Sequence, residues 1–202
     1  LTLLTDFGTK DAYVAAMKGV ILGRGPALRV IDITHEVPPQ DLRRAGYVLA
    51  EAVPYFPAGS VHVVVVDPGV GTERAALVAE VDGQLVVAPD NGVISELLER
   101  AEHWRCFSLD RPELGLETRS QTFHGRDLFA PAGALLASGA IRADQCGAPL
   151  EPVWIRRPAV LLGEDSIMGT IVTVDHFGNL ITDVQRGHLP ERWPDGCEVA
   201  VA

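Results

Sequence analysis

Residues 61–71 read VHVVVVDPGVG. The first six of these residues form a nearly continuous β-branched run, which is typical of a strand buried on both faces of a parallel sheet. The run ends at Asp67, and a loop containing Gly69 and Gly71 follows. The stretch therefore predicts a central parallel strand that carries a carboxylate at its carboxyl end.

Strand-like and helix-like patterns alternate on both sides of this stretch. Such alternation predicts an α/β layered domain with a largely parallel central sheet and helices. Asp82-Gly83 is a plausible hairpin turn between two of the strands. The expected strands are residues 1–4, 28–33, 61–66, 75–81, 84–87 and 104–109, and the expected helices are 11–22, 41–53, 91–100 and 127–138.

The pattern changes after residue 150. We predict an N-terminal α/β domain over residues 1–150, a proline-containing linker over 151–165 and a small β-rich, barrel-like domain over 166–202. Residues 169–175 and 180–183 look like short strands with no helix between them. Because so few residues rarely make a stable β-domain, we expect the C-terminal domain to be incomplete.

Composition narrows the class of protein. The 202 residues are 47% hydrophobic and 22% charged, with a formal net charge of -10. An acidic balance disfavours a nucleic-acid partner and anionic membrane surfaces. Three widely spaced cysteines, Cys106, Cys146 and Cys197, form no CxxC pair and suggest no disulfide framework. With no membrane-length apolar run and no cleavage signal, we expect a cytoplasmic protein.

Acidic residues follow three of the predicted strands. Ligands of parallel α/β sheets bind at the carboxyl ends of the strands, so Asp6, Asp67 and Asp90 suggest one shared crevice. Each of them could instead serve a turn or a helix cap. Asp11 fits a plain helix-start residue. Arg74 could return to Asp67 or could be a solvated arginine at a sheet edge.

Two further polar patches stand out. Residues 120–127 contain His124 directly before a glycine, although a lone histidine is more often structural than catalytic. Asp127 fits the start of a helix. Residues 175–179, DHFGN, could be a binding loop or an ordinary polar loop. The sequence contains no P-loop, no GxGxxG after the first strand, no HExxH and no GxSxG, so the residues alone do not specify a reaction.

Five motifs in order resemble the family of adenosine-forming S-adenosylmethionine hydrolases, once called a domain of unknown function. The family is related to fluorinase and chlorinase, which are nucleophilic halogenases. The motifs span nearly the whole chain, and the ordered set is specific although each motif is weak alone. They are TDFGTKDAYV (5–14), VVVVDPGVGTER (63–74), APDNGVI (88–94), FHGRDLFAP (123–131) and VDHFGN (174–179).

The resemblance implies a homotrimer with active sites at subunit interfaces and S-adenosylmethionine as the small-molecule substrate. It implies catalytic roles for Asp67, Arg74 and His124. By the same resemblance, the halogenases carry Tyr at the positions of Asp67 and His124. Asp6 would hold the ribose hydroxyls. Gln40 occupies the position at which the halogenases have an aromatic residue that stacks on the adenine base. A C-terminal segment of the family that contains Arg and Ser is absent from this sequence. The other implied substrate-binding residues are Phe7, Asp11, Phe123, Asp175, Phe177 and Asn179.

The implied chemistry is displacement by water at the ribose C5′ carbon. The sulfonium leaves as a neutral thioether, so the reaction needs an oriented, activated water rather than a general acid. Asp67 or His124 could take the proton while Arg74 keeps Asp67 ionised. No cofactor and no metal is expected. Alternatives are a metal-dependent hydrolase using Asp6, Asp67, Asn91 and His176, a ligand-binding sensor without catalysis, and a halogenase.

Overall fold

The computed structural model describes residues 1–110, 120–156, 158–189, 191, 198 and 200. The chain forms two compact units, Leu1–Ile155 and Arg156–Ala202, and each is described by itself. Cys197 lies outside the described residues. Among the described residues, no helix is both long enough and apolar enough to cross a membrane.

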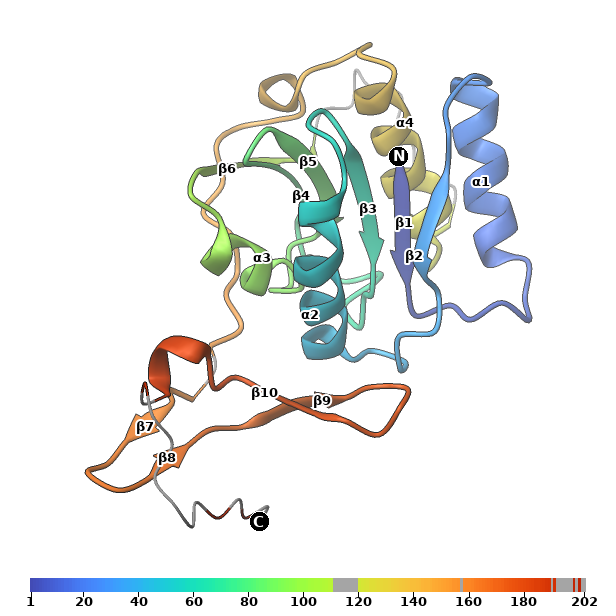
Figure 1. The fold of residues 1–202 in the computed structure, drawn as a ribbon. Helices are drawn as coiled ribbons and strands as arrows, with labels where there is room; N and C mark the ends of the chain where they lie inside the picture. The colour runs from blue at the N-terminus through green and yellow to red at the C-terminus, as the bar shows by residue number, and fades with distance from the viewer. Residues whose placement is uncertain (111–119, 157, 190, 192–197, 199, 201–202) are drawn as a thin grey trace. The chain divides into compact units, whose positions relative to one another are not determined.

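A six-stranded sheet forms the centre of the first unit (Figure 1). Its strands are, in order across the sheet, β2 (Ile31–Thr34), β1 (Thr2–Thr5), β3 (Val61–Val65), β5 (Gln84–Pro89), β4 (Ala76–Val81) and β6 (Trp104–Ser108). The first four are parallel, while β4 runs antiparallel to both β5 and β6. The predicted α/β class with a largely parallel sheet is confirmed.

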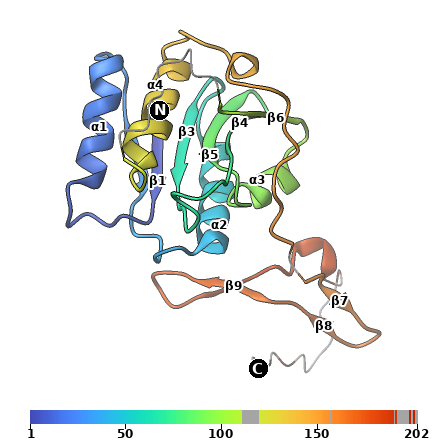
Figure 2. The same cartoon turned by 180° about the vertical axis from the view of Figure 1, so that it is seen from behind.

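Helices cover both faces of this sheet. Helix α1 (Tyr13–Arg24) and helix α4 (Ala130–Ala137) lie on one face, and α2 (Leu42–Ala52) and α3 (Ser95–Arg100) lie on the other (Figure 2). The β-branched run of β3 contributes to both cores, because Val63 and Val65 pack toward α1 and α4 while Val64 and Val66 pack toward α2 and α3. Alternating Cβ directions in a strand account for this division.

The largest differences from the predicted element bounds occur at β2, α3 and α4. β2 begins at Ile31 because the Leu28 N–H donates to the Gly25 carbonyl in a turn after α1. α3 begins at Ser95 because Asn91 Oδ1 accepts the Val93 N–H in a preceding turn. The helix expected over 127–138 is a π-helical turn, Gly125–Phe129, that continues into α4. Single-turn 3-10 helices lie at Val53–Tyr55, Ala143–Gln145 and Arg186–His188.

The second unit contains two small antiparallel sheets. β9 (Ile171–Val174) pairs with β10 (Leu180–Thr182), inside the two ranges predicted as strands. β7 (Leu161–Leu162) pairs with β8 (Ile167–Met168), so part of the segment predicted as a linker is a short hairpin. Residues up to Ile155 belong to the first unit because the N–H of Val153 donates to the Asp90 carboxylate and that of Ile155 donates to Ser95 Oγ.

Candidate active site

The loop after β3 brings Arg74 back to Asp67. Thr72 stabilises its turn, donating from Oγ1 to the Gly69 carbonyl at 2.7 Å. Gly71 has a φ of +79°, and a Cβ there would lie 3.1 Å from the Gln121 carbonyl oxygen, so a side chain is disfavoured on both counts. The loop therefore folds back tightly at the carboxyl end of β3.

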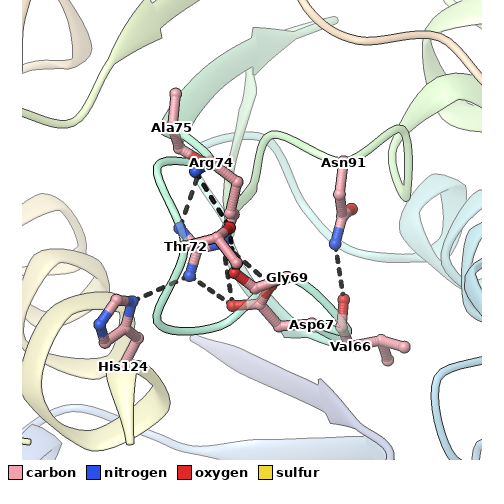
Figure 3. Close-up of polar contacts among 8 residues, drawn as sticks. All are labelled: Val66, Asp67, Gly69, Thr72, Arg74, Ala75, Asn91 and His124. Atoms are coloured by element: carbon pink, nitrogen blue, oxygen red, sulfur yellow. Dashed lines mark hydrogen bonds and ion pairs between the residues drawn. The ribbon is translucent and has the colours of Figure 1, made fainter. Parts of the chain in front are cut away.

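Asp67 and Arg74 form a bidentate ion pair (Figure 3). Arg74 Nε lies 2.9 Å from Asp67 Oδ1, and Arg74 Nη2 contacts Oδ2. The two side chains are only 6% and 10% exposed, which makes their charge–charge attraction stronger than that of a surface pair. The guanidinium also lies over the Phe129 ring, 5.2 Å from its centroid. Of the two alternatives for Arg74, the return to Asp67 is the one observed.

His124 joins this pair through the same guanidinium. Arg74 Nη2 lies 3.0 Å from His124 Nδ1 (Figure 3). A guanidinium is only a donor, so Nδ1 accepts and the ring proton of the neutral imidazole sits on Nε2. Burial and then the positive charge of Arg74 lower the pKa of His124 below its usual value, which favours this neutral form. His124 thus presents an Nε2–H donor.

The other acidic residues after the strands have different surroundings. Asp6 Oδ2 accepts the backbone N–H of Gln40 at 2.7 Å. Asp90 is buried and accepts the N–H of Val153. Asn91, next in the chain, donates from Nδ2 to the Val66 carbonyl at 3.0 Å (Figure 3). Asp90 and Asn91 therefore join segments of the first unit, while Asp6 and Asp67 follow the adjacent parallel strands β1 and β3.

An aromatic cluster borders the Asp6 and His124 segments. The rings of Phe7, Tyr13 and Phe123 pack with centroids 5.2 to 6.1 Å apart. The guanidinium of Arg126 lies over the Phe123 ring at 4.8 Å, and Arg126 Nε pairs with Asp127 Oδ1 at 2.6 Å. Two of these aromatics were predicted as site residues. Tyr13 was not, because no sequence signal distinguishes its ring, which is 49% exposed at the start of α1, from an ordinary surface aromatic.

The remaining predicted substrate-binding residues are Asp11 and those of the 175–179 loop in the second unit. Asp11 is exposed and precedes α1 rather than lying in it. Asp175 Oδ1 accepts the N–H groups of Phe177 and Asn179, each at 2.8 Å, and Oδ2 accepts the Asn179 side-chain amide at 2.7 Å. These bonds, chiefly those from Asn179, lower the pKa of Asp175. The turn leaves Phe177 86% exposed. The substrate contacts suggested for these residues stay predictions.

Metal-binding and thiol chemistry gain no support from the described residues. Among them, no three His, Cys, Asp or Glu side chains are grouped so that they could hold a metal ion. Cys106 and Cys146 are free and buried. Burial, which disfavours the thiolate, raises the pKa of Cys106 to about 12 and that of Cys146 to about 11. Neither thiol is therefore an activated nucleophile.

Residues 1–147 match the family of the SAM hydroxide adenosyltransferase N-terminal domain. The chain belongs to this family. It is 44% identical to the (R)-S-adenosyl-L-methionine hydrolase of Salinispora arenicola, an alignment covering 99% of the chain and 77% of the relative. It is 43% identical to the hydrolase of the same name from Thermus thermophilus, over 91% of the chain and 73% of the relative. The resemblance predicted from the five motifs is confirmed.

Two further comparisons concern a halogenase and a solved fold. Fluorinase of Nocardia brasiliensis is 24% identical over 94% of the chain and 72% of the relative. The crystal structure of an uncharacterized conserved protein from Thermotoga maritima superposes with a TM-score of 0.85 at 38% identity, covering 91% of this chain and 70% of the other. The chain therefore shares its fold with this solved structure.

Proposed function

We propose that this protein hydrolyses S-adenosyl-L-methionine to adenosine and L-methionine by in-line attack of water on the ribose C5′ carbon. The Asp67–Arg74–His124 cluster carries the proposal. The relatives named as hydrolases are 36% to 45% identical to this chain, whereas those named as fluorinases are 23% to 24% identical. That difference favours water over halide as the nucleophile.

The geometry divides the chemical roles among the three side chains. Because His124 offers an Nε2–H, it acts as a donor that fixes the oxygen of the attacking water. The Asp67 carboxylate accepts the proton of that water as the C5′–O bond forms and the C5′–S bond breaks. The electron pair of the broken bond goes to sulfur, which leaves as the neutral thioether of methionine. Arg74 holds both partners in place.

The substrate would be held by carboxylates and aromatic rings. Asp6 would accept the ribose hydroxyls, and Asp11 and Asp175 would lie near the amino-acid part. Phe7 and Phe123 would line the site in the first unit. Phe177 and Asn179 of a neighbouring subunit would contact adenine.

We extend the proposal to a cytoplasmic homotrimer with active sites at subunit interfaces and without a metal or cofactor. Support for an assembly comes from apolar side chains of the second unit that are 47% to 67% exposed. Sedimentation at micromolar concentration would give the assembly state, and a monomer would contradict this part of the proposal. The exposed side chains are Leu161, Leu162, Met168, Val174 and Leu180.

The deciding experiment is incubation of the purified protein with S-adenosylmethionine in chelator and without halide, with chromatography of the products. We expect equimolar adenosine and methionine, and a loss of kcat of about 100-fold or more in Asp67→Asn. Asp144→Asn is the matched control, because Asp144 forms an exposed ion pair with Arg142.

Other outcomes identify the alternatives. Binding without product indicates a sensor, and product that appears only with added metal indicates the metal-dependent hydrolase. A 5′-halonucleoside formed on addition of chloride or fluoride indicates a halogenase. Each of these results would overturn the proposed metal-independent hydrolysis by water.

A further inference from the structure

Two buried histidines contact the two threonines at the ends of β1. His62 Nδ1 lies 2.8 Å from Thr2 Oγ1 at the amino end, and His35 Nδ1 lies 2.9 Å from Thr5 Oγ1 at the carboxyl end. Both rings are at most 5% exposed. The two pairs are alike in chemistry, but only Thr5 adjoins Asp6.

The contacts around His35 form a chain that runs from Asp32 to the loop after β1. Asp32 Oδ2 accepts from Lys18 Nζ at 2.6 Å, and Asp32 Oδ1 lies 3.1 Å from His35 Nε2. His35 Nδ1 and Thr5 Oγ1 share a hydrogen bond of 2.9 Å, and Thr5 Oγ1 also accepts the N–H of Phe7 at 3.2 Å. The chain therefore ends on the backbone directly after Asp6.

Backbone groups of the same segment hold the loop from its other side. The His35 carbonyl accepts the N–H of Gly8 at 2.8 Å. The N–H of Gln40 donates to Asp6 Oδ2 at 2.7 Å. Gln40 has a φ of +65°, which residues other than Gly, Asn and Asp seldom adopt. Residues 35–40 thus constrain the main chain on both sides of Asp6 and its carboxylate.

We propose that His35 is a positioning residue for Asp6 and that, together with the Gln40 N–H, it fixes the carboxylate in the orientation that receives the two ribose hydroxyls of the substrate. This inference rests on the proposed function. A carboxylate has about four lone-pair positions, so one bond from Gln40 leaves both oxygens able to accept a hydroxyl. Positioning of this kind acts on substrate binding rather than on the water at Asp67.

The test compares Thr5→Val with Thr2→Val, since each removes one hydroxyl from a buried threonine that contacts a histidine. We expect Thr5→Val to raise KM about 10-fold with little change in kcat, as lost alignment of one charged hydrogen-bonding group would do. Thr2→Val is expected to leave KM unchanged even if it lowers thermal stability. Equal KM values for the two variants would overturn the proposal.

A double-mutant cycle shows whether the effect passes through Asp6. In an Asp6→Asn background, Thr5→Val is expected to raise KM by less than about 2-fold, because the carboxylate that is positioned has already been replaced. Full additivity would contradict the positioning role. His35→Asn, which keeps a polar atom near the Nδ1 position, is expected to retain a lower KM than His35→Leu.

A readout without turnover separates this inference from the proposed function. Amide hydrogen exchange of Phe7, Gly8 and Gln40 is expected to accelerate in Thr5→Val, while that of Val63 in β3 stays as in the parent protein. If the parent protein turns over no substrate, the proposed function fails, yet the exchange data still decide whether the chain of bonds holds the loop. Unchanged exchange at all three amides would overturn the positioning role in either case.

Discussion

Arg74 is the residue on which the other two members of the cluster depend. It uses Nε and Nη2 on Asp67 and the same Nη2 on His124, so a point charge cannot replace its planar fork. We expect Arg74→Lys to lower kcat about 100-fold, a loss comparable to that of one electrostatic group in an active site. Steady-state kinetics would measure this, with Arg142→Lys in the exposed pair as control. Retained kcat would mean that the charge alone suffices.

The protonation of His124 predicts an acid limit of activity. Burial and Arg74 lower its pKa, so the neutral ring persists below the usual value of about 6.5. Once the pH falls through the lowered pKa, Nδ1 gains a proton, loses the bond from Arg74 and places two cations side by side. We expect kcat to stay level from about pH 8 to 6.5 and to fall at more acidic pH. A profile that instead falls toward alkaline pH would contradict the assigned tautomer.

At the scale of elements, the packing of α4 on β3 depends on a glycine. A Cβ at Gly133 would lie 2.4 Å from Val63 Cγ2, inside the core. We expect Gly133→Ala to lower the free energy of unfolding by about 1–3 kcal/mol, as overpacking does. Gly19→Ala in α1 is the matched control, because its Cβ would meet nothing within 4 Å. That change is expected to raise the free energy of unfolding, measured by chemical denaturation, by about 0.5–1 kcal/mol.

The elements also show where sequence patterns stop being informative. The β-branched run and the alternation of helices and strands predicted the sheet, because both reflect burial that is local in the sequence. The π-helical turn was not predicted, since its apolar spacing resembles that of an α-helix. A Cβ at Gly125 would lie 3.2 Å from Met17 Sδ and 3.2 Å from Phe7 Cε2, so distant residues shape the backbone there.

The candidate site was predictable in its residue types and only partly in its geometry. Asp67, Arg74 and His124 follow from the motifs, and the loop between two of them brings them together. The bond from the Gln40 N–H to Asp6 has no sequence signature, because every residue except proline has the same donor. A hydrogen bond between a backbone N–H and a side chain 34 residues away in the sequence is seen only in the folded chain.

At the scale of the molecule, the buried histidine of β3 links stability to pH. His62 accepts the Thr2 hydroxyl at Nδ1 and donates from Nε2 to Gln84 Oε1 at 2.8 Å, and Gln84 in turn donates to the Val53 carbonyl. In this arrangement the neutral ring carries its proton on Nε2 and accepts at Nδ1. Burial lowers the pKa of His62 from its ordinary value of 6.5.

The sign of the pH dependence follows from proton counting. Below about pH 6.5 the unfolded chain binds a proton at this histidine that the folded chain still excludes. The free energy of unfolding is therefore highest above that pH and falls as the pH drops through 6.5 toward the lowered pKa of His62. Urea titrations at about pH 7.5, 6.5 and 5.5 would measure the decline. His62→Gln is expected to reduce the slope with pH, whereas His103→Gln at an exposed position should preserve it. An unchanged slope in His62→Gln would show that other groups, His124 among them, carry the acid sensitivity of the fold.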